Sequence, residues 1–232
     1  GGNGDYHLLT YAPSSVQEAV DIMMFAYDKA EQYRIPVLFI ADGIIAQMME
    51  PVEMPEMVDF KIDPEKKPWA CTGWKPGDDP EKRGVINSIY IDTESLSEHN
   101  AVLQAMYAEV TKNEKMWENY NCEGAEYIIT AFGTVARIAK SAIDQLKAEG
   151  INVGLVRPIT VWPFPYEAVA EAANADGVKA VLDVELNEGQ MIEDVKIAVN
   201  GAKPIDFFGH CGSQMPTTDE IVAKIKSMKE GK

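Results

Sequence analysis

Apolar and amphipathic segments alternate through the last part of the chain. Residues 127–132 form an apolar run of strand length that ends at Gly133. Thr134 is expected to cap the following helix, Gly150 to end it, and residues 153–156 to form a second buried strand. The helix is predicted from apolar residues three and four positions apart, at Val135, Ile138, Ala139, Ala142, Ile143 and Leu146. A helix between two apolar strands indicates a parallel crossover, and therefore an α/β fold.

The same alternation continues to the end of the chain. Helices are predicted near residues 166–173, 189–199 and 217–228, and strands at 180–186 and 205–209. Thr217 and Glu220 have capping-box spacing at the last helix. Four strands alternating with helices predict a complete doubly wound domain over residues 124–232.

Residues 1–58 contain a shorter version of this pattern. Strands are predicted at 7–11 and 36–41, and a helix at about 15–33 with capping-box spacing at Ser15 and Glu18. Its expected apolar stripe is Val16, Ala19, Val20, Met23, Tyr27 and Ala30. Two parallel strands and one helix cannot cover both faces of a sheet. We therefore expect this region to be the end of a larger doubly wound sheet.

The middle region, residues 59–123, has a different composition. Prolines, tryptophans and charged residues between 61 and 83 indicate a loop. A short strand is predicted at 88–91 and a long helix at about 95–120. A structureless loop of this length is uncommon inside a compact domain, so we expect a linker with an exposed helical arm.

Composition excludes several classes of protein. The net charge of −16, from 37 acidic and 21 basic residues, argues against nucleic-acid binding, which needs a basic face. No apolar run is long enough for a membrane span, and the start has no secretory signal pattern. The scattered cysteines, Cys71, Cys122 and Cys211, offer neither a disulfide framework nor zinc or iron–sulfur spacing. We expect a cytoplasmic protein with reduced cysteines.

Two glycine-containing segments could bind an anion. The glycine-rich residues 1–5 could cradle phosphate, but no strand precedes them and the P-loop lysine is missing, which favours a turn. Gly133 and Thr134 begin a helix whose dipole favours an anion, although every βα turn offers the same geometry.

Acidic residues gather at the end of one predicted strand. Asp183, Glu185 and Glu188 lie where doubly wound sheets bind ligands, so they could act in acid–base chemistry or hold Mg²⁺. No histidine or lysine base is close in sequence, which favours a structural role. A buried Glu185 would then need a hydrogen-bond partner or the charge of Arg157.

The remaining reactive side chains form no recognisable cluster. The histidines His7, His99 and His210 are isolated, and the methionine pairs at 23–24 and 48–49 suit a core or an interface better than a metal. The residues by themselves predict no catalytic, cofactor-binding or metal site.

Longer phrases resemble a known family. Residues 124–232 resemble the C-terminal domain of transketolases, and the whole chain resembles the alpha subunit of 2-oxoacid:ferredoxin oxidoreductases, especially the 2-oxoisovalerate (branched-chain) type. The phrases are GGNGDYHLL, APSSVQEAVDI, DGIIAQMMEPVEMPE, AFGTVARIAKSAIDQLKAEGINVGLVRPITVWPFP, VELNEGQMIEDVKIAVNG and MPTTDEI. The resemblance implies oxidative decarboxylation of a 2-oxoacid with CoA to acyl-CoA, CO2 and reduced ferredoxin.

The resemblance also implies cofactors and partners. Thiamine diphosphate and Mg²⁺ bind between the alpha subunit and a beta subunit, and iron–sulfur clusters lie in partner chains. Gamma and delta subunits are further expected partners, and a homodimer stays open. The family's acidic residue that activates the aminopyrimidine lies in an earlier segment without a counterpart here, so we expect the C-terminal part of such a subunit, inactive by itself. Residues 1–58 would be the C-terminal part of its pyrimidine-binding-type domain. No catalytic residue is carried over.

Several residues match family motif positions without an assigned role: Arg157, Glu185, Asn187 and Gln190. Asn3 stands where relatives often have histidine, so a role for that histidine does not transfer. Three alternatives remain: a non-catalytic assembly module, a 2-oxoglutarate- or pyruvate-type member, and a self-sufficient transketolase-type enzyme. The missing diphosphate-binding domain disfavours the last.

Overall fold

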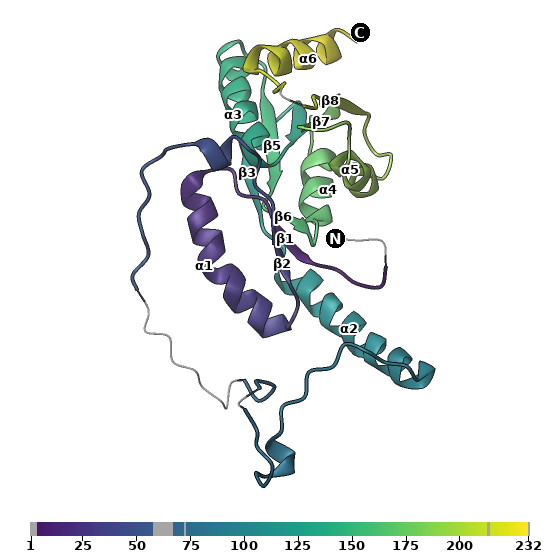
Figure 1. Cartoon of the computed structure of the whole chain (residues 1–232). Helices are drawn as coiled ribbons and strands as arrows, with labels where there is room; N and C mark the ends of the chain where they lie inside the picture. Colours follow the sequence, from purple (N-terminus) through teal and green to yellow (C-terminus); the bar gives the residue numbers. More distant parts are fainter. Residues whose placement is uncertain (1–3, 58–66, 72, 213, 232) are drawn as a thin grey trace. The chain divides into compact units, whose positions relative to one another are not determined.

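The computed structural model describes residues 4–57, 67–71, 73–212 and 214–231 (Figure 1). The chain forms two compact units, one from residues 1–53 with 105–232 and the other from residues 54–104. Asn3 and most of the glycine-rich start lie outside the described residues. Among the described helices, none combines the length and apolarity that a bilayer crossing requires.

A five-stranded sheet forms the centre of the larger unit. Its parallel strands are β4 (Tyr127–Thr130), β5 (Val153–Pro158), β7 (Ala180–Glu185) and β8 (Ile205–Gly209), and β3 (Trp117–Tyr120) pairs antiparallel to β5. The strand order is β3-β5-β4-β7-β8. The chain therefore leaves β4 toward one side for β5 and returns to the other side for β7, so the order reverses between β4 and β7.

Helices cover both faces of this sheet (Figure 1). On one face, α3 (Gly133–Ala148) and α6 (Thr218–Glu230) pack against Ile129, Leu155 and Leu182. On the other face, α4 (Tyr166–Asn174) and α5 (Met191–Val199) pack against Ile128 and Val181. Side chains of successive strand residues point to opposite faces, which explains the continuous apolar runs in the sequence. The predicted α/β class is confirmed.

A second sheet joins the beginning of the chain to this domain. The parallel pair β1 (Leu9–Tyr11) and β2 (Val37–Phe39) flanks α1 (Val16–Tyr33) in sequence, as predicted. A third strand, β6 (Thr160–Trp162), pairs antiparallel to β1 and was not predicted. Since β6 follows β5 directly, the two sheets share one stretch of chain. A short 3-10 helix, η1 (Ile45–Gln47), follows β2.

Helix α1 begins as predicted but buries a different face. The Ser15 hydroxyl accepts a hydrogen bond from the Glu18 N–H, whereas the Glu18 carboxylate accepts from Ser14 and leaves the capping box half formed. The buried residues are Ile22 and Ala26, so the predicted stripe through Met23 and Tyr27 was wrong. In α6 the predicted box of Thr217 and Glu220 is complete.

The long helix predicted at 95–120 was also wrong at its end. Helix α2 (Thr93–Asn113) stops early, and the residues that follow become β3. The Met116 N–H donates to the Thr160 hydroxyl, and this hydroxyl donates to the Met116 carbonyl. These two hydrogen bonds fix the chain just before β3. Asparagine is a poor helix former, and Trp117 and Tyr120 favour strands, so pairing with β5 prevails.

No strand forms at residues 88–91, contrary to the prediction. The Asn87 side chain accepts from the Ile89 N–H and donates to the Ile89 carbonyl. Both backbone groups that a strand would use are therefore taken locally. Between η1 and α2, the described residues form one regular element, the 3-10 helix η2 (Pro80–Lys82).

Helix α3 is capped by a residue from a distant segment. Thr134 does not cap it. Instead its N–H and hydroxyl both donate to the Asp42 carboxylate, at 3.0 and 2.8 Å. The Ile44 and Ile45 N–H groups donate to the same side chain. Gly133 has a φ of 59°, and a side chain there would come within 3.2 Å of Asp42 Oδ2, so this turn favours glycine. Asp42 thus fastens the first segment to the sheet domain.

We expect Asp42→Ala to lower the free energy of unfolding by about 1 kcal/mol, because it removes a capping acceptor and leaves N–H donors unpaired. Urea denaturation measures the loss. The exposed Asp28, replaced by alanine, is the matched control and should show no comparable loss. Added formate should restore part of the stability of the Asp42 variant, and chloride at equal ionic strength should not. Equal stability of the two variants would contradict the capping role.

Candidate functional site

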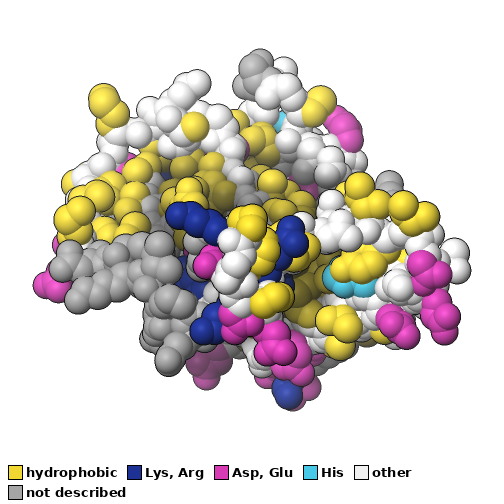
Figure 2. Space-filling view, turned by 60° about the horizontal axis from the view of Figure 1, so that its bottom comes forward, with side chains coloured by type: hydrophobic (Ala, Val, Ile, Leu, Met, Phe, Trp, Pro, Cys, Tyr) yellow, Lys and Arg dark blue, Asp and Glu magenta, His cyan; other side chains and the backbone are white. Residues whose placement is uncertain are grey.

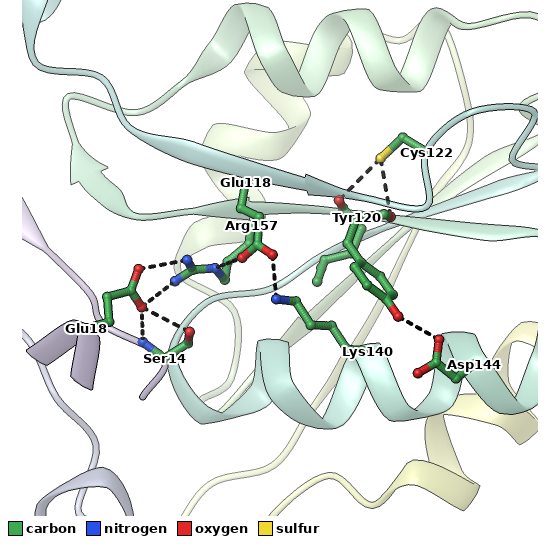
Figure 3. Close-up of polar contacts among 9 residues, drawn as sticks. Ser14, Glu18, Glu118, Tyr120, Cys122, Lys140, Asp144 and Arg157 are labelled. Atoms are coloured by element: carbon green, nitrogen blue, oxygen red, sulfur yellow. Dashed lines mark hydrogen bonds and ion pairs between the residues drawn. The ribbon is translucent and has the colours of Figure 1, made fainter. Parts of the chain in front are cut away.

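Arg157 on β5 is the centre of a buried ion-pair network (Figure 3). Its side chain is 5% exposed. Its two terminal nitrogens donate to the two oxygens of Glu18 on α1, at 2.9 and 2.8 Å, and its Nε donates to Glu118 on β3, at 2.8 Å. The first of these pairs joins residues 139 positions apart. A planar guanidinium is suited to such two-pronged contacts.

The network continues onto α3. Lys140 donates to the second oxygen of Glu118 at 2.5 Å (Figure 3). Burial by itself would raise the pKa of Glu18, but hydrogen bonds from Arg157 and Ser14 and the nearby positive charge lower the pKa overall. Burial by itself would lower the pKa of Arg157, but its hydrogen bonds to Glu18 and Glu118 and their negative charges raise it overall. Every charge has a partner, so the network positions α1, β3, β5 and α3 and leaves no free group for chemistry.

Glu185 is neutralised by hydrogen bonds and not by Arg157. Its buried carboxylate accepts from the N–H groups of Gln190, Met191 and Ile192, at 2.9 to 3.0 Å, and from the Asn187 side-chain amide, at 3.0 Å. These N–H groups lie at the start of α5, which therefore carries its own anion. The hydrogen-bond alternative of the sequence prediction is confirmed, and the Arg157 alternative was wrong.

Asp183 lies fully buried on the same face of β7. The Thr130 hydroxyl donates to its Oδ1 at 2.5 Å, and no described group donates to Oδ2. Burial, followed by the neighbouring Glu185, raises the pKa of Asp183 to about 9. At neutral pH Asp183 therefore holds a proton, which its Oδ2 can donate to Glu185.

Glu188 does not join this acid pair. Its carboxylate instead raises the pKa of the exposed Cys211 thiol. The three acidic residues therefore do not form the shared acid–base or Mg²⁺ site considered from the sequence. Among the described residues, no group of histidine, cysteine and acidic side chains is arranged to hold a metal ion.

A pocket of about 170 Å³ lies at the carboxyl ends of β2, β4 and β7. Gly133, Glu185 and Asn187 line it together with Asp42. The structure thus brings together two predicted candidates, the turn after β4 and the acidic end of β7. The N–H donors predicted to bind an anion at Thr134 are instead occupied by Asp42. No feature of the sequence around Asp42 indicated that it contacts Thr134, 92 positions away.

The other candidate side chains lie apart. His7 stacks on Trp162, His99 on Tyr90, and His210 lies 3.4 Å from Glu220. Burial raises the pKa of the Cys122 thiol, which donates to the Leu155 carbonyl (Figure 3). The methionine pairs do not fill a core, since Met24 is 53% and Met49 99% exposed.

We expect Arg157→Ala to lower the free energy of unfolding by about 3–5 kcal/mol, because it leaves Glu18 and Glu118 without their buried partner. Arg137→Ala is the matched control: its side chain is 40% exposed and pairs with Glu50 near the surface, so its loss should be much smaller than that of Arg157→Ala. Urea denaturation compares them. Similar losses in both variants would contradict the special role of the buried network.

We expect Asp183→Asn to change the pH dependence of stability. Asp183 keeps its proton in the folded chain up to about pH 9, whereas an unfolded Asp releases it near pH 3.8. The bound proton therefore contributes its full stabilisation of the folded state below pH 3.8. This contribution is lost as the pH rises to about 9. Asparagine keeps an oxygen for Thr130 and an N–H for Glu185 without titrating. The advantage of the variant over the wild type should therefore grow from pH 5 to pH 9 in urea unfolding, and Asp28→Asn should run parallel to the wild type. Parallel curves for Asp183→Asn would rule out the bound proton.

Comparison with known proteins identifies two family domains along the chain. Residues 4–119 match the family described as "Pyruvate flavodoxin/ferredoxin oxidoreductase, thiamine diP-bdg". Residues 125–221 match "Pyruvate:ferredoxin oxidoreductase core domain II". The boundary between the two matches falls between β3 and β4.

Similar proteins cover nearly the whole chain. Ketoisovalerate oxidoreductase subunit VorB of Methanothermobacter marburgensis is 38% identical, over 98% of this chain and 62% of the relative. 2-Oxoglutarate synthase subunit KorA of Methanocaldococcus jannaschii is 30% identical, over 95% and 64%. The chain thus spans about three fifths of the length of these curated relatives.

A solved structure shares the fold. The 2-oxoglutarate:ferredoxin oxidoreductase from Magnetococcus marinus superposes with a TM-score of 0.70 at 20% identity, over 97% of this chain and 43% of that one. The two domain matches, and similarity to such subunits along almost every residue, lead to one conclusion: the chain belongs to the 2-oxoacid:ferredoxin oxidoreductase family.

Proposed function

We propose that the chain is part of the alpha subunit of an enzyme that oxidatively decarboxylates a branched-chain 2-oxoacid. The products would be acyl-CoA, CO2 and reduced ferredoxin. The observation that carries this proposal is the 38% identity to a ketoisovalerate oxidoreductase subunit. Identity to the 2-oxoglutarate and pyruvate types is lower, at 30% and 29% in the relatives compared, which favours the branched-chain substrate.

The described residues do not by themselves fit thiamine diphosphate. A diphosphate with Mg²⁺ needs metal ligands and free N–H donors. The described residues hold no metal-type cluster, and the donors at the starts of α3 and α5 are taken by Asp42 and Glu185. We therefore propose that the cofactor and Mg²⁺ are held in the complete complex, together with a beta subunit, and that iron–sulfur clusters lie in partner chains.

In this proposal the chain supplies a frame and not the reacting groups. Arg157 fixes α1 against the five-stranded sheet through Glu18, and Asp42 fixes the segment after β2 to α3. The proposed organisation is a cofactor-domain part at residues 1–58, a linker at 59–123 and a C-terminal domain at 124–232. Gamma and delta subunits would belong to the complex, and ferredoxin and CoA would bind to it. We place the complex in the cytoplasm, where the three free cysteines stay reduced.

A second candidate function is a non-catalytic assembly module. The observation that favours it is the number of hydrophobic side chains at the surface (Figure 2). In residues 54–104, Met57 and Ile91 are 99% and 91% exposed. Where such side chains form a contiguous patch, they mark an interaction surface. The two candidates differ in whether a reconstituted complex turns over a 2-oxoacid.

We expect isothermal titration of the 232-residue chain with thiamine diphosphate and Mg²⁺ to show no saturable binding. The reason is that Asp42 and Glu185 take N–H groups at the starts of α3 and α5 and that the described residues hold no metal-type cluster. The complex reconstituted with a beta subunit should bind the cofactor and reduce a viologen dye with 2-oxoisovalerate and CoA. Tight, Mg²⁺-dependent binding to the chain alone would overturn the shared-site proposal. A stable complex that binds no cofactor and shows no turnover would favour the assembly module.

A further inference from the structure

The 170 Å³ pocket lies where the strand order of the sheet reverses, between β4 and β7. At this point the connections leave toward opposite sides and open a crevice at the carboxyl ends of the strands. Ligands of doubly wound sheets bind in such crevices. The pocket is therefore in the expected place for a ligand, and its lining decides which kind.

The usual ligand at such a place is an anion, bound by free N–H groups at a helix start. Here Asp42 takes the Thr134 N–H at α3, and Glu185 takes the N–H groups of Gln190, Met191 and Ile192 at α5. Their two negative charges also repel an incoming phosphate or carboxylate. The pocket is thus built against the anions that this position commonly holds.

A cation with hydrogen-bond donors fits no better. Asp42 accepts four hydrogen bonds, from the N–H groups of Ile44, Ile45 and Thr134 and from the Thr134 hydroxyl. Glu185 also accepts four. A carboxylate has about four lone-pair sites, so Glu185, which also faces the proton of Asp183, has none left. Asp42 keeps one only at Oδ2, which accepts a single hydrogen bond, from the Thr134 N–H. A cationic group with several donors would leave most of them unpaired.

The rest of the lining is apolar. It consists of Ile40, Ala41, Phe132, Val135, Val184 and Leu186. An apolar cavity of about 150 Å³ accommodates benzene. Ile40 is 38% exposed, so the pocket has a side that a small molecule can enter.

We propose that this pocket binds a small uncharged organic group with a branched aliphatic or ring-shaped body of about four to six carbons. The apolar wall contacts the body, and the two self-satisfied carboxylates exclude its anionic analogues. This inference does not depend on the proposed enzyme activity.

The test compares two probes of nearly identical shape, isobutyramide and isobutyrate, by amide NMR titration of the 232-residue chain at pH 7 and low salt. Isobutyramide should shift signals of residues 132–135 and 184–187 in a saturable way. Isobutyrate should bind at least about tenfold more weakly because of the two carboxylates. Equal binding of both probes, or shifts elsewhere only, would overturn the proposal.

A pair of variants locates the binding. Ile40→Trp places a large ring at the pocket and should weaken isobutyramide binding by at least about tenfold. Ile197→Trp is the matched control, since Ile197 is 64% exposed on α5 and does not line the pocket. Both positions are solvent-accessible, so both variants should fold, which their NMR spectra verify. Unchanged binding in Ile40→Trp, or equal loss in both variants, would refute the site.

Discussion

The buried guanidinium of Arg157 is the interaction on which the arrangement of the larger unit depends. It carries one charge into the interior and meets carboxylates from two other elements, Glu18 on α1 and Glu118 on β3. A buried charge is tolerated only with full partners, so these elements can adopt few positions other than the observed one. The requirement acts on geometry more than on net stability. It explains how Arg157 on β5 and Glu18 on α1 hold a strand and a helix from distant parts of the chain together.

Carboxylates perform a second structural task in this chain. Asp42 and Glu185 stand at the starts of α3 and α5, where proteins of this fold class often hold a ligand's phosphate. Motif residues without an assigned role acquire a physical one here. Asn187 holds Glu185 through its amide and the Gly189 N–H through its oxygen, while the Gln190 N–H completes the cap. Part of the acidic excess of the sequence is therefore built into backbone hydrogen bonding.

Local pattern was enough to predict the elements whose neighbours in sequence are also their neighbours in space. Strands β4, β5, β7 and β8 and the helices between them follow from apolar periodicity and glycine stops. Two of the errors fall where a distant segment decides: β3 and β6 exist because they pair with β5 and β1. The same holds for the site, since the positions of Asp183 and Glu185 at a strand end could be predicted, but not the proton between them or the arrival of Asp42 at Thr134.

The pairing of β1 with β6 has a consequence for how the protein is made. Thr10 faces Trp162, about 150 residues further along the chain. At about 5–20 residues per second, a ribosome needs roughly 8–30 s to reach the second strand after the first. For that time Leu9 and Tyr11, both fully buried in the finished protein, lack one of their two neighbouring strands. The newly made β1 is thus a hydrophobic segment with an open edge during synthesis, when a chaperone or a partner chain can reach it.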